Sequence, residues 1–279
     1  MNRRPQAGFS LLELLLASFL GLIALMGILY IYKGQHKSMA VQGGISGMRM
    51  NGQFTLGEAQ FYLSHVGLGL PSNFRNLSLD AGDLVIRMNP SKRSTAAAMD
   101  PSSNGSQTVY RIAAADSALF SGKGYVAALV GGGVAEAAIV AVVPRPGVPT
   151  EALVRLSGGK SGFSAVSTLY PVDRVRLHRC TGIGSDTVEG DFRVQHDDPG
   201  LRAGLQQDTL TLAEGIESIG YRYILNSRAV VGALPVSLDS LLMVEVTVVA
   251  KSAVADRAAA GDGRKRDTLR AKVGYRRTL

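Results

Sequence analysis

The sequence predicts an α+β protein in which one long N-terminal helix precedes a globular domain of antiparallel strands. Two observations predict this class. The first is an apolar stretch near the N-terminus, Phe9–Tyr32, which contains a single charge, Glu13. The second is the composition of the chain, whose 279 residues include 33 Gly, 6% aromatic residues and no Trp. Short apolar runs separated by Gly, Pro and Asn favour strands and turns over a helical bundle.

The apolar stretch is long enough to cross a membrane. At about 1.5 Å per residue, a helix over Phe9–Tyr32 is about 36 Å long, and a bilayer core is about 30 Å thick. A secretory signal has a shorter apolar region, of about 7–15 residues, with its cleavage site at the far end. In this chain the small residue Gly8 precedes the apolar region. A carboxylate near the centre of a membrane helix costs about 2.5–3.5 kcal/mol, and less near its end, so we expect Glu13 to be functional.

The residues around this segment resemble a known processing signal. Arg3 and Arg4 precede Gly8 and Phe9, and Ser-Leu-Leu-Glu follows up to Glu13. The order and spacing are similar to the class III signal of type IV pilins and type II secretion pseudopilins. The resemblance implies that prepilin peptidase removes residues 1–8 by cutting between Gly8 and Phe9, and that Phe9 is then N-methylated. It also implies that Glu13 meets the N-terminal amine of a neighbouring subunit during filament assembly. The alternative is a plain signal anchor with an accidental glutamate.

The charge of the chain predicts its orientation. The formal net charge is +8, which permits contact with nucleic acid or anionic membrane. More simply, Arg and Lys before a membrane helix keep the N-terminus cytoplasmic. We therefore expect a single-pass protein of the bacterial inner membrane with its C-terminal domain in the periplasm, and the resemblance places it later in a pilus at the cell surface. Cys180 is the only cysteine, so an exported domain has no internal disulfide and depends on its core.

A second helical segment follows the membrane segment, and we assign residues 33–70 to it. Apolar residues recur there at three- and four-residue steps. They are Val41, Ile45, Met48, Leu56, Ala59, Leu63 and Val66. Each Gly in a helix costs about 1 kcal/mol relative to Ala, so we expect a bend or a melted turn near Gly43-Gly44. Gly67 and Gly69 then end the helix. In pilins this second half packs on a β-sheet, and its end resembles that of PilW-type minor pilins.

The remaining residues, 71–279, predict a β-rich domain. Alternating or continuous apolar runs indicate strands, and Gly, Pro and Asn separate them. The predicted strands are 83–88, 107–113, 125–130, 137–143, 151–157, 172–180, 216–223, 241–252 and 267–275. Two polar stretches, 92–106 and 186–205, are predicted to be loops.

The last third of the chain adds to the resemblance. Ile216-Glu217-Ser218-Ile219 and the run from Val244 to Ser252 are similar to PilW minor pilins and, more distantly, to pseudopilin J of type II secretion. The resemblance covers about residues 212–277. It implies a minor pilin that primes type IV pilus assembly as part of a tip complex, with other minor pilins, the major pilin and a tip adhesin as partners. The alternatives are a pseudopilin J-like tip subunit and, from another class, a membrane-anchored periplasmic binding protein or enzyme.

No motif in the sequence indicates an enzyme, a cofactor or a metal site. His178 and Cys180 form a close pair but lack the further ligands of a zinc site. Gly159-Lys160-Ser161 lacks the earlier glycine of a phosphate loop, and Asp191, Asp197 and Asp198 fit no calcium loop. The basic tail after Arg257 has two interpretations. It is either a surface that contacts DNA or anionic lipid, or simply a polar hairpin loop followed by the outer face of a strand. We favour the second interpretation, because the tail lacks aromatic stacking platforms, and predict no specific nucleic-acid partner.

Overall fold

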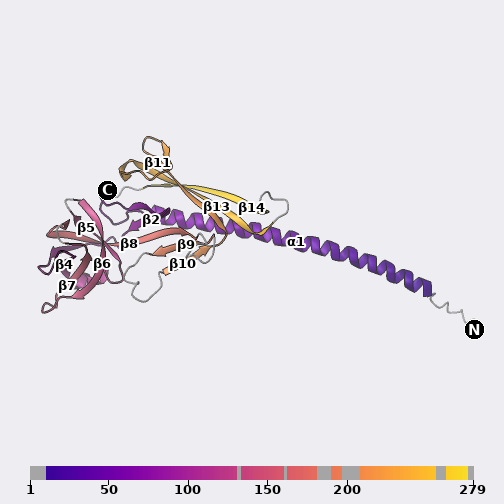
Figure 1. Cartoon of the computed structure of the whole chain (residues 1–279), viewed down its shortest axis with the longest axis horizontal. Coiled ribbons are helices and arrows are strands. Elements are labelled where there is room, and N and C mark those ends of the chain that lie inside the picture. Colours follow the sequence, from indigo (N-terminus) through magenta and orange to yellow (C-terminus); the bar gives the residue numbers. More distant parts are fainter. Residues whose placement is uncertain are drawn as a thin grey trace, which may run out of the picture. The chain divides into compact units, whose positions relative to one another are not determined.

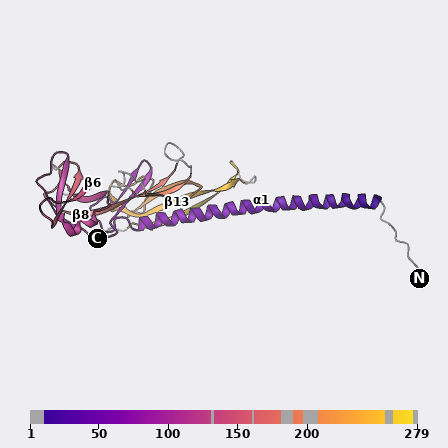
Figure 2. The same cartoon turned by 90° about the horizontal axis from the view of Figure 1, so that it is seen from below.

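The computed structural model has one long helix followed by strands (Figure 1, Figure 2). It describes residues 11–130, 133–159, 162–180, 190–196, 208–255 and 262–275. Two compact units share the chain: Met1–Gly47 with Ser252–Lys265, and Met48–Lys251 with Arg266–Leu279. A long apolar helix ahead of a large antiparallel β-domain confirms the α+β class that the sequence predicts.

The helix α1 runs from Leu11 to Ser64. It continues through Gly43 and Gly44 without interruption, although the glycine content predicts a bend there. In the smaller unit Val254 packs against this place, and its Cβ lies 3.3 Å from where a Cβ on Gly44 would be. This contact supports the helix where its own propensity is weakest.

The end of α1 is set by two glycines. The helix ends at Ser64, earlier than the boundary at residue 70 that we assign from sequence. Gly67 and Gly69 have φ angles of 72° and 68°, in the left-handed region that glycine occupies readily. A Cβ on Gly67 would fall 2.2 Å from Nδ2 of Asn76, so a larger residue does not fit. The amide of Gly67 donates to the carbonyl of Arg87 at 2.9 Å, which ties the helix end to the β-domain.

The long strand β8 (Val166–Arg179) is the centre of the β-domain. Its second half lies in an antiparallel sheet of five strands. In spatial order these are β1 (Leu77–Asp80), β2 (Asp83–Met88), β8, β9 (Phe192–His196) and β10 (Asp208–Ala213). Ile86 of β2 pairs with Val175 of β8, and both side chains are fully buried. The two residues therefore belong to the core of this sheet.

The first half of β8 belongs to a closed antiparallel barrel. From β8 the strands run β3 (Thr95–Met99), β4 (Gln107–Ala113), β7 (Glu151–Ser157), β6 (Gly133–Pro144) and β5 (Tyr125–Val130), which pairs again with β8. Figure 1 shows β4 to β7 grouped together. Tyr110, Phe120, Leu156 and Leu169 are among the buried residues that pack together in its core. Side chains thus fill the barrel, as expected at this strand number.

The barrel joins the five-stranded sheet through charged and apolar contacts. Arg87 of β2 donates from Nε to Oε2 of Glu136 in β6 at 2.8 Å, and from Nη1 to Oγ of Ser78 at 2.8 Å. Leu70 and Phe74 pack with Ala127 and Val172 in a separate buried cluster. Because Leu70 and Phe74 follow α1 directly, the barrel lies next to the C-terminal end of that helix.

A second sheet packs against the last part of α1. Its order is β12 (Val230–Val231), β11 (Ile216–Leu225), β13 (Leu241–Ala255) and β14 (Arg264–Gly274). The helix buries a stripe at three- and four-residue steps, formed by Met48, Gly52, Thr55, Ala59 and Leu63. At Gly52 the approach is closest, since a Cβ there would lie 3.2 Å from Cβ of Ala250 and 2.5 Å from Cδ1 of Leu269. The glycine lets the helix backbone reach the sheet.

Two predicted loops contain strands. The stretch 92–106 includes β3, and the stretch 186–205 includes β9. β3 is rich in Ala, which has low strand propensity, and the barrel imposes its conformation. β9 is a short alternating run that pairs with both β8 and β10. Residues 186–189 and 197–205 of the second stretch lie outside the described residues.

We expect Gly52→Val to destabilise the protein, because a branched side chain overlaps Ala250 and Leu269. Overpacking of this kind costs about 1–3 kcal/mol. Gly57→Ala is the matched control, since nothing lies within 4 Å of a Cβ there and the helix gains up to about 1 kcal/mol. Urea unfolding of the detergent-solubilised chain measures both. Equal stability of the two variants would contradict this packing.

We also expect the buried pair of Arg87 and Glu136 to behave as a unit. Arg87→Met leaves the partly buried carboxylate of Glu136 without its partner and costs about 3 kcal/mol, the lower end of the range for buried pairs. Adding Glu136→Leu removes that carboxylate and recovers a large part of the loss. Arg49→Met, which breaks an exposed pair with Asp267, costs at most about 1 kcal/mol and serves as the control. A double-mutant cycle of unfolding free energies, measured by urea unfolding, tests this coupling. Additive losses of stability in the double variant would contradict it.

Candidate functional site

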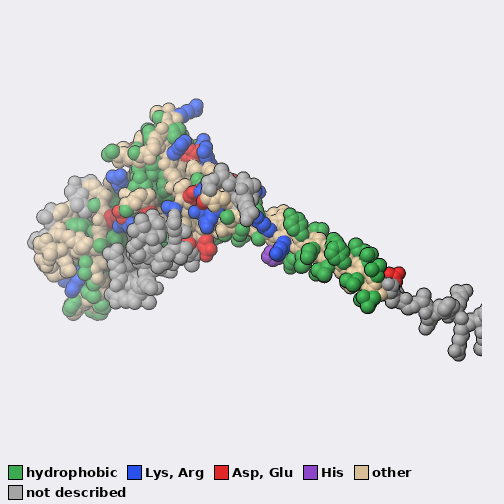
Figure 3. Space-filling model, turned by 45° about the vertical axis from the view of Figure 1, so that its right-hand side comes forward, with side chains coloured by type: hydrophobic (Ala, Val, Ile, Leu, Met, Phe, Trp, Pro, Cys, Tyr) green, Lys and Arg blue, Asp and Glu red, His purple; other side chains and the backbone are tan. Residues whose placement is uncertain are grey.

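The first part of α1 exposes large apolar side chains on all sides. Leu11 is 81% exposed, Phe19 65% and Tyr32 61%. Figure 3 shows mostly hydrophobic side chains along the visible face of this part of the helix. Burying one such side chain is worth about 1.5–3 kcal/mol, so a surface of this extent marks contact with a membrane or with other subunits. By length and composition, α1 is able to cross a membrane.

Two polar side chains near the start of α1, Ser18 and Glu13, are stabilised by the helix in different ways. Ser18 donates from Oγ to the carbonyl of Leu14 at 2.8 Å, so the helix itself satisfies this hydroxyl. Glu13 lies in the first turn of α1 and is exposed. The positive end of the helix dipole favours a carboxylate at this position. Gly8 and Phe9, the predicted cleavage residues, lie outside the described residues.

The apolar surface ends in residues typical of a membrane interface. Tyr30 and Tyr32 are followed by Lys33, His36 and Lys37, and all five are exposed. The rings of Tyr32 and His36 lie 6.1 Å apart. Aromatic and basic side chains of this kind sit at the level of lipid headgroups. The segment from Leu11 to Tyr32 therefore ends, on its C-terminal side, in the residues expected where a membrane-spanning helix leaves the bilayer.

The last part of α1 exposes further apolar side chains, which sequence reasoning missed. Met50 is 68% exposed, Phe54 47% and Phe61 54%. The sequence periodicity identified the opposite, buried stripe, in which Met48, Ala59, Leu63 and Val66 are indeed buried. The sequence could have indicated this second apolar stripe, because its three residues also recur at helical spacing.

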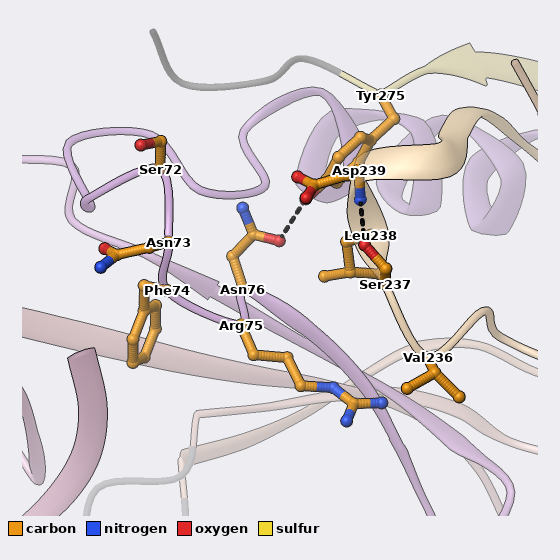
Figure 4. A pocket seen from close by; sticks show the side chains of 10 residues that line it. All are labelled: Ser72, Asn73, Phe74, Arg75, Asn76, Val236, Ser237, Leu238, Asp239 and Tyr275. Atoms are coloured by element: carbon orange, nitrogen blue, oxygen red, sulfur yellow. Dashed lines mark hydrogen bonds between the residues drawn. The ribbon is translucent and has the colours of Figure 1, made fainter. Parts of the chain in front are cut away.

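A polar hollow of about 280 Å³ lies between the loop after α1 and the segment before β13 (Figure 4). Its lining comprises Ser72, Asn73, Phe74, Arg75, Asn76, Val236, Ser237, Leu238, Asp239 and Tyr275. Tyr275 donates from its hydroxyl to Oδ1 of Asn76 at 2.7 Å, and the amide of Asp239 donates to Oγ of Ser237 at 3.3 Å. None of the described residues of this lining is a His, Cys or Lys.

His178, at the end of β8, and Cys180, directly after it, both belong to the β-domain. Nδ1 of His178 lies 2.8 Å from Oδ2 of Asp83, and Cys180 is fully buried. Burial raises the pKa of Asp83, although His178 and Arg176 act in the opposite direction. Among the described residues, no group of three or more His, Cys, Asp or Glu side chains is placed to hold a metal ion. Asp191 lies in the described part of the chain, whereas Asp197 and Asp198 lie outside it.

The basic tail is partly a strand. Arg266, Arg270 and Lys272 are exposed on β14 and alternate with less exposed residues such as Leu269. Arg266 donates from Nε to Oε2 of Glu217 at 2.5 Å, across the sheet. Arg257 lies outside the described residues. The described part of the tail thus has the alternation of a strand with one solvated face.

Comparison with known proteins agrees with the N-terminal signal. Residues 3–29 match the prokaryotic N-terminal methylation motif. The match supports a type IV pilin-like or pseudopilin-like protein, and such a motif implies processing by prepilin peptidase and assembly with other pilins. No curated protein and no solved structure matches the chain significantly.

Proposed function

We propose that this chain is a PilW-like minor pilin, which primes type IV pilus assembly as part of a tip complex. Prepilin peptidase cuts after Gly8, the new N-terminal Phe9 is methylated, and Glu13 guides entry into the filament. The observation that carries the proposal is the combination of the methylation motif with an apolar helix that the described chain leaves exposed. The role is structural, and the chain acts by assembly and not by catalysis.

Glu13 suits a role in recognition between subunits. A carboxylate and an N-terminal amine are each costly to bury singly, whereas their pairing offsets part of that cost. The remaining residues from Leu11 to Tyr32 are uncharged, so they provide little specificity among helices. One buried ion pair then sets the axial position of one helix against its neighbour. Its removal is expected to impair assembly more than membrane insertion.

The barrel supports a place at the end of the filament. It is inserted between β2 and the second half of β8, and it packs against Leu70 and Phe74 just after α1. In our proposal, this is the end of the domain that a further subunit would cover in the shaft of a filament. A bulky insertion is tolerated most easily where no further subunit follows. This argument favours the tip over the shaft.

The partners and location follow from this role. The chain spans the bacterial inner membrane once, with its β-domain in the periplasm, and then joins other minor pilins, the major pilin and a tip adhesin. In the membrane, lipid covers the apolar part of α1. In the pilus, neighbouring helices cover the same surface.

We expect mass spectrometry of the mature protein to find N-methyl-Phe9 as the first residue. Gly8→Leu is expected to leave the full-length precursor in the membrane, because a bulky residue occupies the cleavage position. Gly21→Leu, which changes an open position within α1, is the control and is expected to leave cleavage intact. Normal cleavage of the Gly8 variant to a Phe9 start would remove the basis of the proposal.

We expect Glu13→Ala to reach the membrane and be processed, but to be lost from filaments, because the neighbouring amine has no carboxylate partner. Glu13→Asp is the control, since it keeps the charge on a shorter side chain and is expected to retain part of the incorporation. Immunoblots of sheared pili and membrane fractions measure both. Full incorporation of the alanine variant would argue against an assembly role for this acid.

A further inference from the structure

The polar hollow of Figure 4 has two walls that packing and hydrogen bonds hold in place. The first wall is the loop of residues 72–76, in which the ring of Phe74 is buried in the β-domain. The second wall is the segment of residues 236–239, where the carbonyl of Asp239 accepts from Nδ2 of Asn226 at 2.9 Å. All the lining residues belong to the larger unit. The shape of the hollow is therefore set within the β-domain.

The first wall carries hydrogen-bond donors that the described chain does not use. Arg75 is exposed, and its guanidinium makes no hydrogen bond or ion pair with any described residue. The side chains of Ser72 and Asn73 likewise have no hydrogen-bond partner in the described chain. By contrast, Arg49 and Arg87 each contact a carboxylate within the protein. Because the planar fork of a guanidinium matches the two oxygens of a carboxylate, this wall suits a ligand with a carboxylate group.

The second wall offers extended backbone and apolar side chains. Ser237 has a φ of −99° and a ψ of 119°, and Val236 and Ser237 lie outside the strands of the described chain. Their amides donate no hydrogen bond to another described residue. Val236 is 92% exposed, and Leu238 adds a second apolar side chain to this wall. Extended backbone with free amides pairs readily with an extended peptide, so this wall suits a peptide that carries an apolar side chain.

The size of the hollow favours the end of a chain over a continuous segment. Its volume of about 280 Å³ is at the lower limit of pockets for drug-sized ligands, which span about 300–1,000 Å³. It therefore admits one or two residues. Figure 4 shows the guanidinium of Arg75 on the Val236 side of the opening, whereas Asp239 lies toward Tyr275. A carboxylate bound to Arg75 thus lies away from the acidic side chain of the lining.

We propose that this hollow binds the carboxyl terminus of another protein chain. Arg75 pairs with the terminal carboxylate, and the backbone of Val236 and Ser237 pairs with the last peptide unit. Val236 and Leu238 contact an apolar side chain on the terminal residue. The inference goes beyond the proposed function and does not depend on it, since no lining residue belongs to the apolar segment or to the methylation motif.

Fluorescence polarisation with the full-length chain in detergent tests the site. The probe is a fluorescein-labelled peptide that ends in Gly-Ser-Gly-Val with a free carboxylate, and the matched control is the same peptide with a C-terminal amide. We expect the free carboxylate to bind about tenfold more tightly, because an amide cannot accept two charge-assisted hydrogen bonds from a guanidinium. Equal affinities, or binding of neither peptide, would overturn the proposal. Competition by acetate as strong as that by the unlabelled peptide would also overturn it, because the site would then recognise a bare anion.

Two substitutions at exposed positions locate the binding site. We expect Arg75→Gln to abolish the preference for the free carboxylate, and Val236→Asp to weaken its binding about tenfold through like-charge repulsion. Arg222→Gln is the control, since Arg222 is exposed on β11 and does not line the hollow. Urea unfolding is expected to show equal stability for all three variants. A preserved preference in the Arg75 variant would refute the assignment. These results are distinguishable from failure of the proposed function, which N-methylation of Phe9 and incorporation into pili test separately.

Discussion

The contact between α1 and the four-stranded sheet at Gly52 is the constraint that fixes the last part of the helix against the β-domain. A glycine there lets the helix backbone reach Ala250 and Leu269, and the buried stripe continues through Ala59 to Leu63. Helices of this length gain most of their stability from packing and not from propensity. The sheet thus holds the last part of the helix in a defined orientation. Its opposite face, which carries Met50, Phe54 and Phe61, is exposed.

Strand β8 unites the rest of the domain. Its first half closes the barrel and its second half is a central strand of the five-stranded sheet, so the two parts share one continuous backbone. The buried pair of Arg87 and Glu136 adds a side-chain link between them. A shared strand makes relative movement of barrel and sheet costly, because it would break ladders on both sides. The insertion is therefore part of the domain and not a loosely attached appendage.

The sequence predicts the elements better than their arrangement. The runs 83–88, 107–113 and 151–157 coincide with β2, β4 and β7, because alternation and turn residues mark strands locally. β3 is not predicted from the sequence, because its Ala-rich segment forms a strand only through pairing within the barrel. Closure of the barrel depends on the pairing of β5 with β8, which no local pattern encodes. Likewise Glu13 is marked by its apolar neighbours. The sequence shows two apolar stripes on the last part of α1, and only the structure shows which of them the sheet covers.

With the proposed place at the filament tip, the barrel next to the end of α1 has a consequence for stoichiometry. A subunit that ends a filament is needed once for each filament, whereas shaft subunits are needed in proportion to length. On the proposed role, the cellular amount of this chain sets how many filaments begin and leaves their length to the major pilin. Overproduction would then give more and shorter pili from the same pool of major subunit.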